Sequence, residues 1–291
     1  MIQPDFSPRK CILCHEEKSI HPLFFKNGYT IVKCNTCSLI YTNELPQETE
    51  LAHIYSAEYY GGGSKYAGEQ SASALNALNN VKELLDLPEI RRDTWLDVGC
   101  AIGDFIAAAQ KDVSQLYGVD VSTFAAVQAR IRGLKNIYSG TLYEANFSSE
   151  QFDLVSLWDV IEHVTDPLAV LQECNRILKP GGYLALSTGD IGSLMARLMG
   201  KYWHLMTPQQ HLYFFTAETM RSILEKAGFG RVNIRYKGKR VALDFMFRKL
   251  TQTIVPGMSD VVLRLSNGLR LGKIVPVVNL WDIMTVYTRK E

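Results

Sequence analysis

The feature that most constrains this fold is a short apolar stretch that runs into a glycine turn. It spans Trp95 to Phe105, and an acidic residue, Asp120, closes the next expected strand. In a doubly wound sheet such a pair builds a nucleotide pocket, because glycine lets the backbone approach the ligand and the carboxylate accepts hydrogen bonds from ribose hydroxyls. The sequence therefore predicts nucleoside binding, with an ordinary strand-to-helix connection as the alternative.

The spacing of this turn and the segments after it favour an α/β sheet. Gly99 and Gly103 stand four residues apart with Ala101 between them, which departs from the dinucleotide fingerprint and points away from a pyrophosphate ligand. Residues 152–157 read as a buried strand, and residues 178–186 read as a helix end, a turn and a strand. Alternating strands and helices of this kind predict a parallel sheet.

With these motifs in order, roughly the last two hundred residues resemble the class I S-adenosylmethionine-dependent methyltransferases. The resemblance implies a Rossmann-like, seven-stranded sheet with helical lid insertions, and S-adenosylmethionine as the cofactor. It places the methionine part of the cofactor at the glycine turn, the ribose at Asp120 and the adenine near Thr141. The implied cofactor-binding residues are Asp97, Gly99, Cys100, Ala101, Gly103, Asp120, Val121, Thr141, Leu142, Trp158 and Asp159.

Four cysteines near the N-terminus have the spacing of a metal site. Cys11 and Cys14 form one C-x-x-C knuckle, and Cys34 and Cys37 form another after nineteen intervening residues. Two such knuckles can hold one tetrahedral zinc ion, and a closed four-thiolate site is structural rather than catalytic. Asn27-Gly28 between them predicts a hairpin turn. Two disulfides, or four unrelated thiols, are the alternatives.

The motifs divide the chain into three parts. We expect a zinc ribbon over residues 1–46, a helical linker or N-terminal cap over 47–90, and the methyltransferase domain over 91–291. Two insertions in that domain are expected at about 190–215 and 241–275. They are rich in aromatic and apolar residues and could cover the active site, while the second could also lie against lipid.

Within the linker, Gln47–Tyr55 reads as a short helix, Gly61–Gly63 as a hinge, and about Glu69–Leu87 as a second helix that packs on the sheet.

Two candidate catalytic residues come directly after the fourth expected strand, and a third lies near the end of the first insertion. Glu162 and His163 lie where ligands bind in this architecture, beyond the carboxyl ends of the strands. His163 is the leading candidate base because an imidazole titrates near neutral pH. His211, in a His-Leu-Tyr-Phe-Phe sequence, is the second. Positioning of the cofactor loop by the Glu-His pair, and a packed His211 bonded to backbone, are the structural alternatives.

Composition limits the partners. The 291 residues are 47% hydrophobic and 21% charged with a net charge of +1, which suits a globular enzyme and does not favour nucleic acid. No signal peptide and no apolar run of about 20 residues is apparent, so we expect a cytoplasmic protein without a transmembrane segment. A peripheral membrane contact and the oligomeric state stay open.

The resemblance implies methyl transfer to a small-molecule acceptor, such as a sugar nucleotide, a surface-glycan precursor or a secondary metabolite. One rival is an RNA methyltransferase whose zinc ribbon grips the nucleic acid, although the tight basic clusters, Arg91-Arg92 and Lys237–Arg240, read as solvated faces. A non-catalytic module that binds the cofactor and a partner is the other rival. The sequence leaves open whether carbon, oxygen or nitrogen is methylated.

Overall fold

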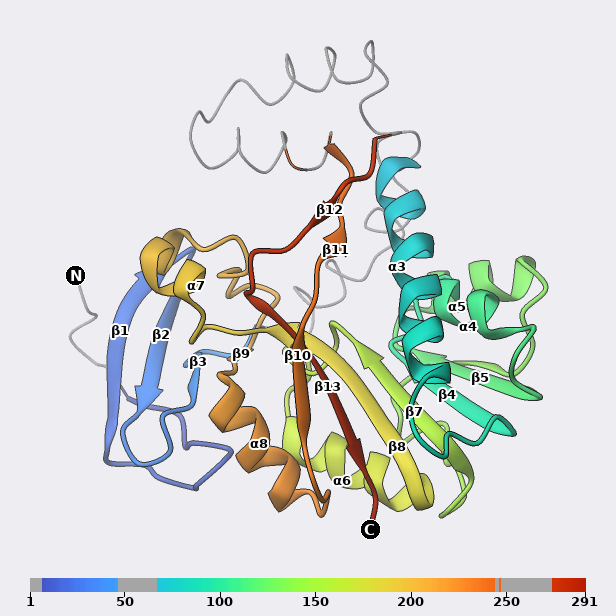
Figure 1. The fold of residues 1–291 in the computed structure, drawn as a ribbon. Helices are drawn as coiled ribbons and strands as arrows, with labels where there is room; N and C mark the ends of the chain where they lie inside the picture. Colours follow the sequence, from blue (N-terminus) through green and yellow to red (C-terminus); the bar gives the residue numbers. More distant parts are fainter. Residues whose placement is uncertain (1–6, 47–66, 244–245, 247–273) are drawn as a thin grey trace.

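The computed structural model describes residues 7–46, 67–243, 246 and 274–291 (Figure 1). The expected Gln47–Tyr55 helix, the Gly61–Gly63 hinge and most of the second insertion lie outside the described residues. Within these residues no helix is long and apolar enough to cross a membrane.

A seven-stranded sheet with the order β10-β13-β8-β7-β4-β5-β6 forms the centre of the molecule. Strands β4 to β8 pair in parallel, whereas β13 is antiparallel to β8 and to β10. The strands are β4 (Thr94–Val98), β5 (Gln115–Asp120), β6 (Ile137–Ser139), β7 (Phe152–Trp158), β8 (Leu178–Gly189), β10 (Asn233–Tyr236) and β13 (Ile283–Arg289). The expected Rossmann-like sheet of seven strands is confirmed.

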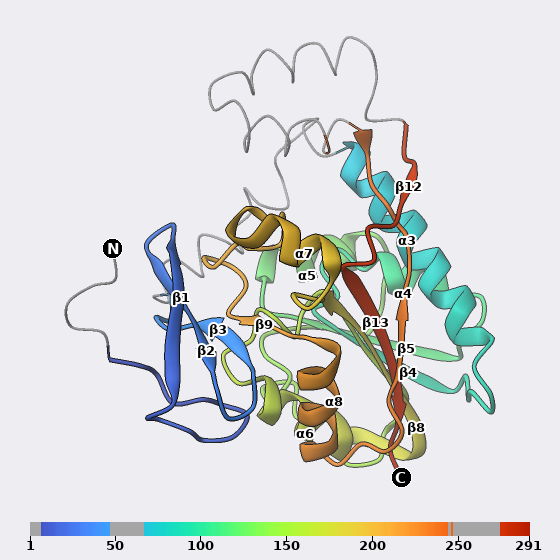
Figure 2. The same cartoon turned by 60° about the vertical axis from the view of Figure 1, so that its left-hand side comes forward.

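Helices cover both faces of this sheet, and neighbouring strand residues serve opposite faces. Trp95 packs toward α3 and α4, whereas Leu96 belongs to the cluster under α6 and α8. Figures 1 and 2 show the two helical layers. The helices are α3 (Ala67–Leu85), α4 (Asp104–Ala109), α5 (Thr123–Ile131), α6 (Pro167–Ile177) and α8 (Ala217–Lys226). Strands buried on both faces explain why β4 and β7 read as continuous apolar runs.

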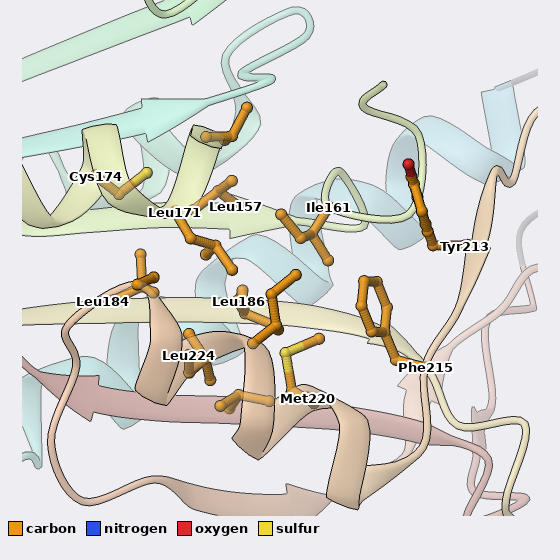
Figure 3. Packing of buried hydrophobic residues seen from close by; sticks show 14 of the residues in the cluster. Leu157, Ile161, Leu171, Cys174, Leu184, Leu186, Tyr213, Phe215, Met220 and Leu224 are labelled. Atoms are coloured by element: carbon orange, nitrogen blue, oxygen red, sulfur yellow. The ribbon is translucent and has the colours of Figure 1, made fainter. Parts of the chain in front are cut away.

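The larger core lies between the sheet, α6 and α8 (Figure 3). Leu171 from α6 and Leu224 from α8 meet Leu157 and Leu186 from the sheet, and all four are fully buried. The same cluster continues into the N-terminal module through Leu39 and other buried residues. The two modules therefore share one hydrophobic core.

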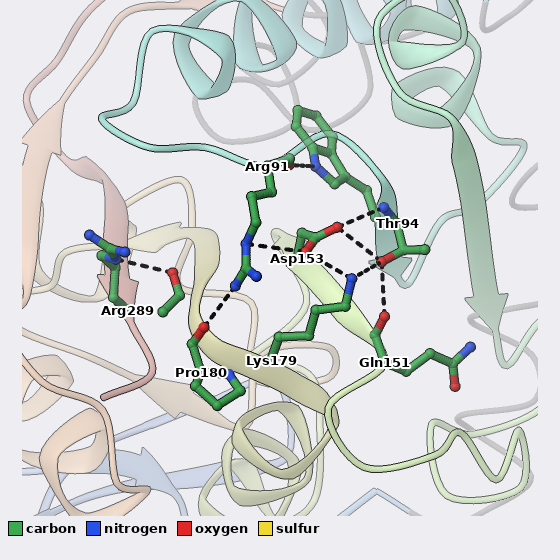
Figure 4. A network of polar contacts seen from close by, with 9 residues as sticks. Arg91, Thr94, Gln151, Asp153, Lys179, Pro180 and Arg289 are labelled. Carbon is green, nitrogen blue, oxygen red and sulfur yellow. Dashed lines mark hydrogen bonds and ion pairs between the residues drawn. The ribbon is translucent and has the colours of Figure 1, made fainter.

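An ion-pair network lies at the amino ends of β4 and β7 (Figure 4). The buried Asp153 carboxylate accepts hydrogen bonds from Lys179 Nζ at 2.9 Å and from the backbone nitrogen of Thr94 at 2.9 Å, and Arg91 lies 3.4 Å away. Burial alone would raise the pKa of Asp153, but these contacts outweigh it and lower the pKa. Because this network lies at the edge opposite the ligand-binding edge, it stabilises the sheet and is not a candidate site.

The N-terminal module is a four-stranded antiparallel sheet, and its last strand comes from the far larger part of the chain that follows residue 91. Its order is β1-β2-β3-β9, and the expected hairpin turn is confirmed at Asn27 and Gly28, which have φ of 50° and 90°. The strands are β1 (Ile20–Lys26), β2 (Tyr29–Cys34), β3 (Ile40–Thr42) and β9 (Tyr213–Phe214). The pairing of β3 with β9 was not predicted from the sequence.

The first insertion packs against the hairpin. It contains α7 (Leu194–Met199) and the 3-10 helix η2 (Gly200–Tyr202), and its buried Trp203 and Met206 belong to the same core cluster as Ile31 of β2. A short two-stranded sheet, β11 (Lys239–Arg240) with β12 (Val277–Val278), flanks the second insertion.

Two element boundaries differ from expectation. Helix α3 covers 67–85 instead of about 69–87. The expected helix end is found, since α6 ends at Ile177, but β8 begins at once at Leu178, where a turn was expected first. The expected turn becomes a shift of register: Phe152 pairs with Leu178, but Leu154 pairs with Tyr183. The chain at Pro180–Gly182 bulges within β8 and does not leave the sheet, and proline and glycine in a sequence do not distinguish such a bulge from a turn.

Candidate active site

The glycine turn after β4 is tightly packed and needs its glycines. Gly99 has φ of 70°, and a Cβ atom there would lie 2.5 Å from Cγ2 of Val160. Gly103 has φ of 84°, and a Cβ atom there would lie 2.1 Å from Cδ1 of Leu134. Ala101 also has a positive φ, 47°, an unusual conformation for a residue with a side chain. The turn at the carboxyl end of β4 therefore packs directly against Val160 and Leu134.

Asp120 holds this turn from the end of β5. Its Oδ2 accepts a hydrogen bond of 2.8 Å from the backbone nitrogen of Ala101, and its Oδ1 accepts one of 2.8 Å from that of Ser122. Burial raises the pKa of Asp120 in spite of these bonds. Each carboxylate oxygen keeps a second acceptor position. The next residue, Val121, is 53% exposed, whereas Asp120 itself is buried.

Asp97 and Cys100, also expected at the cofactor, are buried inside the turn. Ser156 Oγ donates a hydrogen bond of 2.7 Å to Asp97 Oδ1, and burial raises the pKa of Asp97 to about 8. Burial likewise raises the pKa of Cys100. Both side chains therefore lie buried beneath the turn, where Asp97 links it to β7 through Ser156.

The two further expected cofactor loops lie at the ends of β6 and β7. In the first, Glu144 accepts hydrogen bonds from the backbone nitrogen and hydroxyl of Thr141, at 2.7 and 2.9 Å, and Leu142 is buried. In the second, the Trp158 ring lies 5.6 Å from that of Phe105, and its buried Nε1 has no hydrogen-bond partner among the described residues. A buried unpaired donor beside the glycine turn fits a ligand that carries an acceptor group.

Three candidate catalytic residues from two distant segments meet at the carboxyl end of β7. Glu162, His163 and His211 each offer a side-chain oxygen or nitrogen atom, and these atoms lie within 4.8 Å of one another. The two imidazole rings meet edge to face with centroids 4.7 Å apart. The structure thus brings together all three residues that the sequence proposed for acid–base chemistry.

Backbone carbonyls fix the tautomers of both histidines. Nδ1 of His163 lies 2.9 Å from the carbonyl oxygen of Gln210, and Nδ1 of His211 lies 2.7 Å from that of Leu205. A carbonyl only accepts, so each Nδ1 carries the proton and each neutral ring keeps its lone pair on Nε2. Burial lowers the pKa of His163, which keeps it neutral at neutral pH.

Glu162 is an unusual acid. It is 4% exposed, and its Oε2 has no hydrogen-bond partner among the described residues. Burial, and secondarily the charge of Asp159, raise its pKa to about 8. Glu162 is thus largely protonated at neutral pH, next to a neutral His163.

Lys239 is a site residue that the sequence did not single out. Its ammonium group pairs with Asp159, which also accepts a 2.7 Å hydrogen bond from Ser187. Lys237 pairs with Glu83 of α3. The expectation that Lys237–Arg240 forms a solvated face is wrong for these two lysines, because the β11 segment folds back over acidic side chains. Nothing in the local sequence signals these pairs.

The four N-terminal cysteines converge as their spacing predicted. The Sγ atoms of Cys11 and Cys37 lie 3.5 Å apart, and those of Cys14 and Cys34 lie 3.4 Å apart. All four atoms lie within 4.8 Å of one another, and none of these cysteines forms a disulfide. Zinc–sulfur bonds of about 2.3 Å in a tetrahedron place the sulfur atoms about 3.8 Å apart, so the cluster fits a zinc ion.

Known proteins resemble the chain mainly over the large domain. A family model described as a methyltransferase domain matches residues 70–233, more than half of the chain. A ubiquinone biosynthesis O-methyltransferase of Cereibacter sphaeroides is 30% identical over 149 residues, 47% of this chain and 60% of the relative. One of Vibrio cholerae is 32% identical over 99 residues, 32% of this chain and 40% of the relative. The chain thus spans about half the length of these curated relatives.

The crystal structure of an S-adenosylmethionine-dependent methyltransferase from Thermotoga maritima shares the fold. Its TM-score is 0.53 at 23% identity, and the match covers 82% of this chain and all of that one. The family match, the seven-stranded sheet and the turn that Asp120 holds agree with one another. The chain therefore belongs to the class I S-adenosylmethionine-dependent methyltransferases.

Proposed function

We propose that this methyltransferase acts on a hydroxyl group of a small molecule. The observation that carries this proposal is the position of the Glu162–His163–His211 cluster. Val160, two residues before Glu162, lies against Gly99 of the cofactor turn. The acid–base cluster and the expected methyl donor therefore belong to adjacent loops. Oxygen is favoured as the acceptor atom because the curated relatives are named O-methyltransferases.

The chain's own residues fit S-adenosylmethionine. The backbone at Gly99, Ala101 and Gly103 would face its methionine part, with Asp97 and Cys100 supporting the turn from below. Asp120 has acceptor positions for the ribose hydroxyls, beside Val121. The unpaired Trp158 Nε1 supplies a donor, and Thr141, Leu142 and Asp159 border the remaining space.

His163 is the base in this proposal. Bound S-adenosylmethionine supplies an electrophilic methyl group, so the protein has to orient the acceptor, exclude water and take up its proton. His163 is neutral and its Nε2 is basic, because Nδ1 donates to the carbonyl of Gln210. Protonated Glu162 can donate a hydrogen bond to the acceptor oxygen, and His211 closes the other side. The aromatic first insertion, 193–215, would cover the acceptor.

The cysteine cluster is proposed to hold one structural zinc ion. Four thiolates complete the coordination shell, so no open position remains for chemistry. A module of this size has a small core, and metal binding would supply much of its folding free energy.

Neutralised basic residues argue against the RNA alternative. Arg91, Lys237 and Lys239 pair with Asp153, Glu83 and Asp159, so three of the five basic residues in the two clusters are offset by acidic side chains. A binding mode based on phosphate contacts needs an unpaired cationic face.

A screen with methyl-labelled S-adenosylmethionine tests the proposal. Its arms are phenols and catechols, sugar nucleotides, and RNA transcripts at low and high salt. We expect transfer in one of the small-molecule arms, and ether formation in the product would establish oxygen as the acceptor. Transfer only to RNA, with a steep loss at high salt, would establish the alternative. If the cofactor binds and no arm is methylated, the non-catalytic interpretation gains support.

A further inference from the structure

The segment that carries His211 is held between the cysteine module and the loop of Glu162. On one side, Thr42 of β3 donates from its backbone nitrogen to the Leu212 carbonyl at 2.9 Å and from its Oγ1 to the His211 carbonyl at 3.1 Å. On the other side, the Leu212 backbone nitrogen donates to the Glu162 carbonyl at 2.7 Å. Thr42 is fully buried, so water does not replace these bonds.

Arg9 reinforces the same junction from the start of the module. Its guanidinium donates to the Thr42 carbonyl at 2.9 Å and to the Tyr213 hydroxyl at 3.0 Å. The guanidinium also lies over the rings of Tyr41 and Tyr213, 5.1 and 5.3 Å from their centroids. The Tyr213 hydroxyl in turn donates to the carbonyl of Thr165 at 2.9 Å. One side chain thus links the module, β9 and the loop after His163.

We propose that Arg9 and Thr42 are positioning residues for the Glu162–His163–His211 cluster. The N-terminal module then does more than stabilise the chain: its β3 edge sets where the 210–213 segment lies against Glu162. The carbonyl of Gln210, which fixes the His163 tautomer, belongs to that segment. Among the described residues, the hydrogen bonds that hold the cofactor turn come from Asp120 and Ser156 of the sheet and not from the N-terminal module. The module therefore governs the acceptor half of the site and leaves the cofactor half unaffected. Only the catalytic meaning of the cluster rests on the proposed function.

Substitutions in the full-length, metal-loaded protein separate this role from general stabilisation. Thr42→Val removes the hydroxyl donor and keeps the shape, and Thr42→Ser restores the donor. Arg9→Met removes the guanidinium and keeps an apolar stem. Thr36→Val and Lys10→Met are the matched controls in the same module. In the wild type, the exposed Thr36 hydroxyl bonds to Glu16 and the exposed Lys10 amine pairs with Glu17.

Hydrogen exchange and histidine NMR are the readouts, and neither needs an acceptor. In Thr42→Val and Arg9→Met we expect exchange at the Leu212 and Tyr213 amides to rise about fivefold or more, since one lost hydrogen bond corresponds to such a factor. Exchange in β4 and β5 should not change. Two-bond 1H–15N spectra should show a single Nδ1–H tautomer for both histidines in the wild type and a mixture in these variants. Thr42→Ser should restore the wild-type spectra.

The inference is overturned if exchange and tautomers stay at wild-type values in Thr42→Val, or if Thr36→Val changes them equally. If Arg9→Met unfolds the module, the comparison of Thr42→Val with Thr42→Ser still tests the positioning role. Titration with S-adenosylhomocysteine runs in parallel, and we expect its affinity to stay within about twofold of wild type in every variant that folds. If the wild type does not bind this ligand, the proposed function fails, while the exchange comparison still tests the positioning role.

Discussion

The backbone nitrogen of Ala101 donates a 2.8 Å hydrogen bond to Oδ2 of Asp120, so the acid at the end of β5 holds the glycine turn at the end of β4. The same carboxylate accepts from Ser122 through its other oxygen. Asp120 therefore fixes the backbone of the turn, and in the proposed site it would also present acceptors to the ribose.

Asp120→Ala should weaken S-adenosylmethionine binding by about tenfold or more, because hydrogen bonds to a charged group contribute roughly 1.5–3 kcal/mol each. Isothermal titration calorimetry measures this loss. The exposed Asp112→Ala is the control and should keep wild-type affinity. Equal affinities for the two variants would contradict the role given to Asp120.

Replacing Gly99 tests how closely the two loops approach. Gly99→Ala places a methyl group against Val160 and forces a positive φ on alanine, and we expect a loss of about 1–3 kcal/mol in the free energy of unfolding. Gly133 has φ of 85° with nothing within 4 Å of a Cβ atom, so Gly133→Ala isolates the backbone contribution. Urea denaturation of both variants gives the difference. If the two losses are equal, the contact with Val160 does not contribute.

Stability should depend on pH through Asp97 and Glu162. Folding raises both pKa values to about 8 from ordinary values of 3.8 and 4.5. The native state therefore keeps protons that the unfolded chain releases, and stability from these groups falls as pH rises from about 4 to about 8. Asp97→Asn and Glu162→Gln should each flatten this decline in melting temperature. An unchanged slope in both variants would show that neither acid is protonated in the native state.

His163→Gln should lower the rate of methyl transfer by about 10²–10⁴-fold, the usual contribution of a general base. Cofactor affinity should stay at the wild-type value, because the ring bonds to Gln210 and not to the glycine turn. The measurement uses the acceptor identified by the screen. His21→Gln, at an exposed position of β1, serves as the control. A full rate in His163→Gln would exclude this residue as the base.

The purified chain should contain one zinc ion, which elemental analysis can count. Cys37→Ser should lose it and lower the melting temperature, because a structural zinc ion would contribute folding free energy to the module. Cys174→Ala replaces a buried core cysteine of α6 and should keep the ion. Zinc retained by Cys37→Ser together with the other three single serine variants would argue against the four-thiolate site.

The sequence predicted features that are local along the chain. The turn at Gly99, Asp120 after the next strand, the Asn27-Gly28 hairpin and the cysteine knuckles all lie within short motifs whose backbone needs are encoded in the residues themselves. Such motifs require only the correct residue at a fixed spacing, so they can be read without knowledge of tertiary contacts.

Contacts between segments that lie far apart in the chain could not be predicted from such local motifs. His163 and His211 lie in different motifs, and tertiary contacts such as the Leu212–Glu162 pairing and the His163–Gln210 bond bring their rings together. Lys239 reaches Asp159 from beyond the first insertion, where a run of basic residues indicates a solvated surface. Both cases depend on how loops fold back over the sheet, which no local periodicity records.

Strand β9 belongs to the large domain but completes the sheet of the N-terminal module, so neither part keeps its full set of strands when the other is removed. A fragment that starts at residue 67 would expose Tyr213 and Phe214 as a bare apolar edge, and edges of that kind pair between copies. Truncated versions should therefore self-associate. Transplanting the ribbon onto another enzyme would require the β9 segment to move with it.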